Sequence, residues 1–553
     1  MSFGLRDRCL GIAVHRTQRS ASCLALIIGG LLLSHPLAAD PPSVSSLLPS
    51  GVSRGTEVVV KLQGKPGTAP LSFWSSSEGL QIQADEKPDQ ILVRATEAVA
   101  PGLHWLRLYN AEGTTSLRPF VVGALPEISE TEPNQKTGEA ADLLLPMTVN
   151  GVLAGREDVD LFAITLQAGQ TLVASIDAAG RLGSPMDSFL QVLSPAGFPL
   201  AQVDDDRGTD PQLAFTARET GRHFVRVMAF PADPNSTIRL SSSPDYVYRL
   251  SLTTGFFAER TVPAAVQIGQ PAEVSFFGWN PLETPPRLSF QPTELGLQSV
   301  WTEGLPRDVP VLVTASPVAS EEQARTAPQP LPYQIAGKLA QPDEIDRYPF
   351  DGKKGQKLLL SATARQLGSP ADIIVRLEDA TGKVLQEVDD KALGTADTYL
   401  EATLPADGTY HAVVLERFQA GGPRYDYLIS LGQPIPELLA TVASDAFTVK
   451  AGETVKIPIT LERRFGDDRE WTFSAQNLPA GVTSTPATSS AKGDTSKSVT
   501  LELTTTKEAL FAGPLSVIAT TGTAEEVKTI PVTVSKSQPP QSLPHLWLTV
   551  TAP

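Results

Sequence analysis

The chain contains only two cysteines, Cys9 and Cys23, and both lie within its first 39 residues. Beyond residue 39 it therefore has no thiol to act as a nucleophile and no disulfide to hold a fold together. Histidine is scarce too. Past residue 39 the histidines are His104, His223, His411 and His545.

The sequence also lacks a His-Glu-x-x-His zinc helix, a Gly-x-Ser-x-Gly elbow and a phosphate-binding loop. These absences argue against the common hydrolase and nucleotide-binding classes, and we predict a protein without enzymatic activity. Residue type alone does not exclude a glycosidase that uses paired carboxylates. However, no segment resembles a catalytic barrel or jelly roll of adequate size.

Charged residues make up only 19% of the chain, and the net charge is -16. Residues 1–39 carry four Arg and one Asp, so the remainder has a net charge of -16 minus 3, or -19. A field of this sign disfavours nucleic acid and anionic membranes and is compatible with cations. After residue 39 no apolar run is long enough to span a bilayer.

The first 39 residues have the pattern of an export signal. Four arginines precede the apolar run 24–33, and Leu37-Ala38-Ala39 follows with small residues at 38 and 39. This pattern predicts a signal peptide that is cleaved near Ala39, and hence a secreted protein, periplasmic or extracellular. A membrane anchor is the alternative, but the apolar run is too short for one.

The whole chain is rich in proline and glycine, with 47 and 42 residues, and most of them lie beyond residue 39. Alternating runs such as 56–62 and 103–109 lie between turn residues, as in immunoglobulin-like sandwiches. Periodicity typical of amphipathic helices is hard to find. A chain of 553 residues is also too long for one core.

An internal repeat determines the domain organisation. Seven landmarks recur in the same order. They are Gly151-Val152-Leu153 and Gly337-Lys338-Leu339; Asp158-Val159-Asp160 and Glu344-Ile345-Asp346; Gly169-Gln170 and Gly355-Gln356; Leu182-Gly183-Ser184-Pro185 and Leu367-Gly368-Ser369-Pro370; Asp204-Asp205 and Asp389-Asp390; Gly221 and Gly408; Tyr246-Val247-Tyr248 and Tyr425-Asp426-Tyr427.

Together with Glu132-Pro133-Asn134, these landmarks resemble the bacterial pre-peptidase C-terminal domain family. The resemblance covers 127–255 and 319–433. It implies a compact, jelly-roll-like β-sandwich of the kind that is appended to secreted peptidases and other exported proteins. No peptidase domain is recognisable in this sequence.

The sequence therefore predicts an all-β chain of tandem β-sandwich modules. The expected divisions are a signal peptide at 1–39, an immunoglobulin-like sandwich at 40–126, the first repeat at 127–255, a reduced immunoglobulin-like module at 256–318, the second repeat at 319–433, an immunoglobulin-like sandwich at 434–536, and a linker with a loose tail at 537–553.

Oxygen-bearing side chains gather where the first repeat begins. In an extended segment Glu130, Glu132 and Asn134 point to the same side. The loop that holds Asp158 and Asp160 can bring further carboxylates, and calcium prefers six to eight such oxygens. The resemblance to collagen-binding members of the family implies calcium ligation by these five residues.

Two observations weaken the calcium prediction. Gln135 stands where that pattern has Asp, so one anionic ligand is missing. The alternative is that the acids are solvated turn residues, with Asp160 bracing its loop. The second repeat has Ser320-Glu321-Glu322-Gln323 in place of the opening motif and lacks the Asn. Turn roles are also favoured for the aspartates at 204–206 and 389–390.

A binding or structural role at the cell envelope or outside the cell is the function that the sequence favours, with an unknown protein or polysaccharide as partner. The alternatives are an accessory subunit of a separately encoded secreted hydrolase, or a hydrolase of unrecognised type. Tyrosines of the late strands could contact a ligand, but their i, i+2 spacing fits packing against a core better.

Overall fold

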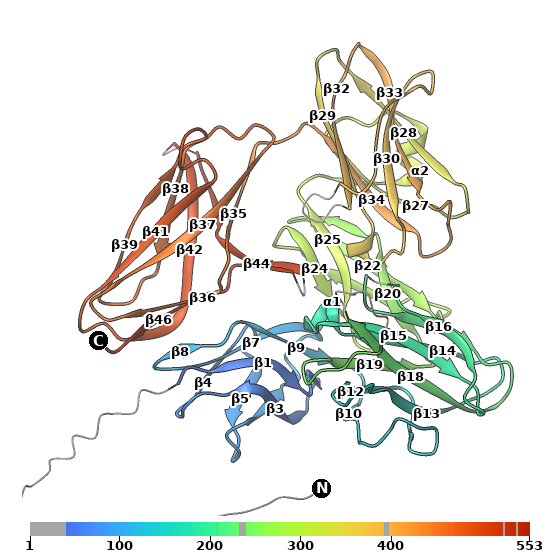
Figure 1. Cartoon of the computed structure of the whole chain (residues 1–553). Coiled ribbons are helices and arrows are strands. Elements are labelled where there is room, and N and C mark those ends of the chain that lie inside the picture. The colour runs from blue at the N-terminus through green and yellow to red at the C-terminus, as the bar shows by residue number, and fades with distance from the viewer. Residues whose placement is uncertain (1–39, 207, 232–238, 392–396, 524–525, 538–539) are drawn as a thin grey trace, which may run out of the picture. The chain divides into compact units, whose positions relative to one another are not determined.

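The computed structural model describes residues 40–553 except 207, 232–238, 392–396, 524–525 and 538–539. The expected signal peptide, 1–39, lies outside the described residues together with both cysteines. Figure 1 shows a chain built from β-sandwiches. Within the described residues, helix is confined to α1 (Ala179–Leu182), α2 (Glu321–Thr326) and a 3-10 turn at Arg365–Leu367. The prediction of an all-β fold with tandem sandwich modules is confirmed.

The opening module, residues 40–126, packs two sheets around one core. One sheet has the order β1-β3-β6-β5, and the other has β2-β9-β7-β4 with β8 paired to β7. The strands are β1 (Ser43–Leu48), β2 (Gly51–Ser53), β3 (Glu57–Lys65), β4 (Ser72–Ser75), β5 (Leu80–Ala84), β6 (Gln90–Ala95), β7 (Gly102–Asn110), β8 (Gly113–Thr114) and β9 (Arg118–Gly123). Val60, Ile91, Leu106 and Phe120 are fully buried between the sheets, because alternate side chains of each strand face inward.

The first repeat module, residues 127–255, consists of two five-stranded sheets. Their orders are β10-β12-β19-β14-β17 and β11-β13-β18-β15-β16. The strands are β10 (Glu127–Ser129), β11 (Ala141–Asp142), β12 (Met147–Val152), β13 (Asp160–Leu166), β14 (Thr171–Asp177), β15 (Met186–Leu193), β16 (Pro199–Val203), β17 (Gln212–Thr216), β18 (Gly221–Pro231) and β19 (Val247–Thr253). Val149, Phe162, Ile176 and Val225 belong to its core.

The second repeat module, residues 319–433 together with the start of β26, has the same strand order. Its sheets run β26-β27-β34-β29-β32 and β28-β33-β30-β31, so that only a counterpart of β11 is missing among the described strands. The strands are β26 (Val318–Ser320), β27 (Tyr333–Lys338), β28 (Ile345–Gly352), β29 (Lys357–Thr363), β30 (Ile373–Asp379), β31 (Val384–Val388), β32 (Thr398–Thr403), β33 (Gly408–Glu416) and β34 (Asp426–Gly432). The repeated landmarks thus fall at corresponding positions of the two modules, some on strands and others in the turns between them.

The middle module, residues 256–318, is a small sandwich of two three-stranded sheets. It contains β20 (Phe257–Val262), β21 (Ala265–Gln267), β22 (Ala272–Trp279), β23 (Arg287–Phe290), β24 (Gly296–Val300) and β25 (Val309–Thr314). The orders β20-β22-β23 and β21-β25-β24 match β1-β3-β6 and β2-β9-β7 of the opening module. The module is therefore an opening-type sandwich without the outer strands.

The closing module, residues 434–551, holds the largest sheets of the described chain, with the orders β39-β41-β37-β35-β44-β45 and β36-β46-β42-β38-β40. Its strands are β35 (Glu437–Val442), β36 (Ala446–Lys450), β37 (Thr454–Arg464), β38 (Trp471–Gln476), β39 (Val482–Thr485), β40 (Ala487–Ser489), β41 (Ser498–Thr505), β42 (Phe511–Thr523), β43 (Glu526–Pro531), which pairs with β42, β44 (Thr533–Ser537), β45 (Pro540–Leu543) and β46 (Leu546–Thr551).

The prediction of a loose tail at 537–553 is wrong for β46. Every residue of this strand is buried, and it lies between β36, its parallel neighbour, and β42, its antiparallel neighbour. The apolar residues Leu546, Leu548 and Val550 belong to the core of the closing module. The closing sandwich therefore extends past residue 536 and includes this strand.

No helix in the described part of the chain is long and apolar enough to cross a membrane.

Candidate metal centre

The opening segment of the first repeat module crosses from one sheet to the other. At its start, the Glu130 N–H donates to the carbonyl of Asn150 in β12, at 3.0 Å. At its end, the Leu161 N–H of β13 donates to the Asn134 carbonyl, also at 3.0 Å. Because both ends are anchored, the side chains between them are held over the start of β13, where Asp160 lies.

Four of the five predicted ligand residues come together there. Carboxylate oxygens of Glu130, Glu132 and Asp160 all lie within 4.8 Å of one another. The Asn134 amide nitrogen lies 3.5 Å from Glu130 Oε2. We call these four residues the first acidic cluster.

Asp158 lies outside the first acidic cluster and has other partners. Its Oδ2 accepts from the Gly155 N–H at 2.9 Å, so it braces the loop before β13. Its Oδ1 accepts from Gln135 Nε2 at 3.2 Å, and the same amide donates to Glu132 Oε2 at 2.7 Å. The amide of Gln135 therefore bridges two carboxylates in place of a further anionic ligand.

Two buried acceptors in the first acidic cluster have no donor. Asp160 is fully buried and Asn134 is 2% exposed, yet Asp160 Oδ1 and Asn134 Oδ1 have no hydrogen-bond partner. Buried polar atoms in folded proteins are nearly always paired, so each exception needs an explanation. A cation at this point would accept electron density from both oxygens at once.

The remaining oxygens of Glu130 and Asp160 converge on one tyrosine. Tyr248 Oη lies 2.6 Å from Asp160 Oδ2 and 3.0 Å from Glu130 Oε2. One hydroxyl proton is thus shared between two carboxylates. The Val152 N–H donates to Glu130 Oε1 at 2.6 Å, which fixes the second oxygen of that residue.

Burial makes these carboxyl groups resist ionisation. It raises the pKa of Asp160 to about 10, with the Glu130 charge as the next cause. Burial also raises the pKa of Glu130 and of Glu132. Among the described residues no Lys or Arg forms an ion pair with the first acidic cluster. A divalent cation would supply the missing positive charge and displace the retained protons.

The second repeat module has the same arrangement, but an arginine supplies the charge. Its carboxylates, Glu321, Glu344 and Asp346, form the second acidic cluster. The Arg325 guanidinium contacts all three of them. The Tyr427 hydroxyl donates to Asp346, as Tyr248 does to Asp160. In this module an arginine side chain supplies positive charge to the carboxylates.

Sequence reasoning missed Arg325 although it left a signal. Ser320 and Gln323 form a capping box that begins α2, and Arg325 lies four residues after Glu321 on that helix. The pKa of Asp346 is raised by burial to about 7, a smaller rise than that of Asp160. The nearby Arg325 charge is one of the causes that hold it down.

A repeated glycine lets each tyrosine reach its aspartate. Gly151 lies opposite Tyr248 and Gly337 lies opposite Tyr427 in the sheets. A Cβ on Gly151 would lie 2.3 Å from Tyr248 Cζ, and one on Gly337 would lie 2.5 Å from Tyr427 Cζ. Each ring lies directly over its glycine, where there is no room for a methyl group.

We expect Gly151→Ala to destabilise the first repeat module by about 1–3 kcal/mol, because the buried ring of Tyr248 must move. Urea denaturation of the 40–553 protein measures this loss. Gly138→Ala is the matched control, since a Cβ there meets nothing within 4 Å. An equal effect of the two substitutions would contradict the packing argument.

The other predicted residues have structural partners. Arg417 pairs with Asp389 and Asp390, while Asp206 pairs with Arg424 at 2.9 Å. Tyr248 and Tyr427 are fully buried, so the packing interpretation of the late-strand tyrosines is confirmed for these two. They act on the clusters from inside the modules and are not exposed to a ligand.

Comparison with known families agrees with this fold. Residues 158–229 match the family model described as the bacterial pre-peptidase C-terminal domain. The chain therefore contains such a domain, and the matched residues begin at Asp158, within the loop before β13. The match does not extend to the second repeat module.

One curated relative is a probable subtilase-type serine protease of Deinococcus radiodurans. It is 30% identical over 123 residues, which are 22% of this chain and 16% of the relative. The match thus spans about a sixth of the length of that protease.

Solved structures with some similarity include the fibronectin(III)-like modules of Clostridium thermocellum CbhA. They are 12% identical, cover 40% of this chain and 94% of theirs, and have a TM-score of 0.13. Another is the M60 catalytic domain with the CBM51-1 and CBM51-2 domains of Clostridium perfringens ZmpB. It is 9% identical, covers 72% of this chain and 55% of that chain, and has a TM-score of 0.15.

Proposed function

We propose that this chain, which contains a bacterial pre-peptidase C-terminal domain, is an exported non-enzymatic protein that presents a binding surface on β-sandwich modules joined by ion pairs. The observation that carries the proposal is the way in which its modules are joined. Ion pairs between mostly buried side chains connect neighbouring modules. Modules joined only by flexible linkers would be free to move relative to one another.

Three of these connections illustrate the point. Arg181 of α1 pairs at 2.9 Å with Asp308 of the middle module. Arg424 of the second repeat module pairs at 2.9 Å with Asp206 of the first, and at 3.0 Å with Glu259 of the middle module. All five side chains are at most 22% exposed. Such networks fix the relative orientation of neighbouring modules, which is what a presenting scaffold requires.

Calcium would brace the first repeat module of this scaffold. Glu130, Glu132, Asn134 and Asp160 supply carboxylate and amide oxygens, which are the ligands that calcium prefers. Arg325 supports the proposal, because the carboxylates of the second acidic cluster are paired with the positive charge of this side chain. The first acidic cluster would take its positive charge from calcium. The brace stabilises the module and takes no part in a reaction.

A role as accessory subunit of a separately encoded secreted hydrolase is the second candidate. It is favoured by the similarity to part of a probable subtilase-type protease. In that case the partner is a hydrolase, and the scaffold positions it or its substrate. The partner at the envelope would otherwise be a structural protein or a polysaccharide.

Two assays on the 40–553 protein separate these readings. We expect broad peptidase and glycosidase substrates to remain uncleaved, and reproducible turnover would overturn the proposal. Affinity capture from the native envelope should then return a structural protein or glycan. A hydrolase captured in stoichiometric amount would select the accessory role.

A further inference from the structure

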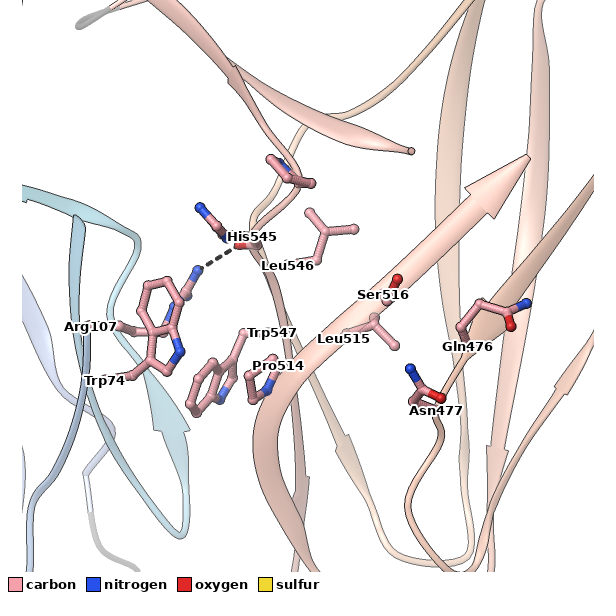
Figure 2. Close-up of a pocket in the computed structure, with 11 residues that line it drawn as sticks. Trp74, Arg107, Gln476, Asn477, Pro514, Leu515, Ser516, His545, Leu546 and Trp547 are labelled. Atoms are coloured by element: carbon pink, nitrogen blue, oxygen red, sulfur yellow. Dashed lines mark hydrogen bonds between the residues drawn. The ribbon is translucent and has the colours of Figure 1, made fainter. Parts of the chain in front are cut away.

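The opening and closing modules enclose an aromatic pocket that the calcium brace does not involve. Its volume is about 230 Å³. Figure 2 shows Trp74 and Arg107 reaching it from the opening module, and Trp547 and Pro514 from the closing module. Trp74 lies on β4 and Trp547 on β46, so the pocket forms only when both modules are present.

Aromatic rings form the walls of this pocket. The Trp74 ring is centred 5.3 Å from His545 and 6.5 Å from Trp547. Trp547 and Arg107 are buried, whereas Trp74 and His545 are half-buried and thus accessible at their outer faces. Ring faces of this kind attract the C–H groups of a ligand, since the face of an aromatic ring carries partial negative charge.

Polar groups lie at the rim of the pocket. Gln476 and Asn477 are exposed there, and each amide can both donate and accept hydrogen bonds. The Ser516 hydroxyl lies on the same rim. In addition, the buried Trp547 Nε1–H has no acceptor. The pocket thus combines ring faces with groups that pair with hydroxyls.

The charges exclude an ionic ligand. The Arg107 guanidinium lies 5.4 Å from the centre of the Trp547 ring and would repel a cation. Asp445 lies 3.6 Å from Arg107 and already balances its charge, so an anion would gain little. Burial lowers the pKa of His545, with the Arg107 charge as the second cause, so this ring is neutral at pH 7.

From this combination we infer that the pocket binds a short neutral glycan, with the C–H face of one sugar ring on Trp74 and the hydroxyls of a further sugar unit on Asn477 and Gln476. The cavity is smaller than the ~300 Å³ at which sites for drug-sized ligands begin, which suits a short glycan segment that is partly exposed to solvent. This inference rests on the proposed binding function and gives it a ligand class.

The test is a titration of the 40–553 protein with glucose, galactose, mannose, N-acetylglucosamine and the disaccharides cellobiose and chitobiose. Tryptophan fluorescence and calorimetry report binding. We expect saturable binding of at least one of these sugars, with a dissociation constant near ~1 mM or tighter. A proline-rich peptide, which could also lie on aromatic rings, is titrated in parallel.

Two substitutions locate the site. Trp74→Ala removes the ring face, and Asn477→Gly removes the amide while it preserves a backbone that has φ of 52°. Each should weaken sugar binding at least tenfold. Phe418→Ala, which removes an aromatic ring that is 74% exposed elsewhere, should leave it unchanged. Thermal unfolding of each variant checks that it is folded, and exposed Asn477 is the safer of the two sites.

Three outcomes would overturn the inference. The first is that no sugar of the panel shows saturable binding up to about 20 mM, which is well above the ~1 mM range. The second is sugar binding that survives both substitutions, and the third is binding of the proline-rich peptide alone. A blank panel beside a normal calcium response and absent turnover would reject the pocket and leave the proposed function standing.

Discussion

Calcium should raise the melting temperature of the first repeat module within the 40–553 protein, and a chelator should reverse the rise. The first acidic cluster has three carboxylates, two unpaired buried acceptors and no neighbouring cation in the described chain. At a calcium concentration about 100 times the dissociation constant, linkage adds ~2.7 kcal/mol to the free energy of unfolding. For a cooperative unit of 150–250 residues this corresponds to roughly 5–10 °C.

Asp160→Asn should abolish this calcium response without lowering the melting temperature that is measured in chelator. The reason is that the pKa of Asp160 is raised to about 10, so the residue is held protonated when no cation is present. The neutral amide of Asn therefore resembles the protonated carboxyl group of the calcium-free protein. It removes only the anionic ligand that calcium would need. Differential scanning calorimetry with and without EDTA measures both quantities.

The second acidic cluster provides the matched control. Asp346→Asn removes the equivalent carboxylate from a cluster in which Arg325 already supplies a positive charge. This variant should lose stability because the ion pair is broken, yet it should keep the full calcium response. A parent protein with no calcium-dependent shift would end the proposal of a calcium brace.

Replacing Arg107 by Met should cost about 3–5 kcal/mol of stability, the range found when one partner of a buried ion pair is removed. Arg107 and Asp445 are each 1% exposed, and their charged atoms lie 3.6 Å apart. Arg107 also donates to the Thr115 carbonyl at 2.7 Å and to the His545 carbonyl at 3.2 Å. The substitution therefore removes contacts in both the opening and the closing module.

Chemical denaturation of the parent, Arg107→Met, Asp445→Asn and the double variant completes a thermodynamic cycle. We expect the double variant to be more stable than Arg107→Met, since it leaves no uncompensated charge. Limited proteolysis should cut Arg107→Met faster than the parent protein. A loss below about 1 kcal/mol, the scale of an exposed ion pair, would show that the pair contributes little.

The repeat allowed much of the fold to be predicted from the sequence. Landmarks such as Gly151 and Tyr248 are local and recur because each module needs the same ring over the same glycine. The last strand could not be predicted in this way. It follows a Pro/Ser/Gln-rich stretch, and what makes it a strand is its pairing with β36, about 100 residues earlier.

For the site, alternation along 130–134 predicted which side chains gather, and the structure brings Glu130, Glu132 and Asn134 to Asp160. The pattern could not show that the Gln135 amide donates a hydrogen bond to Asp158. Nor did it identify Arg325, although the capping box of Ser320 and Gln323 marks the start of the short helix that carries this residue. Contacts between residues that are hundreds of positions apart, such as Trp74 and Trp547, do not produce a periodic pattern in the sequence and therefore could not be predicted from it.

The closing module also affects the order in which the chain can complete its fold. Trp105 and Leu117 belong to the opening module by sequence, yet they are buried in the core cluster of the closing module. During synthesis, which proceeds from the N-terminus, these apolar side chains emerge more than 300 residues before the strands that cover them. During synthesis the opening sandwich is therefore expected to expose apolar side chains after it has folded. Completion of the closing module, including β46, buries them.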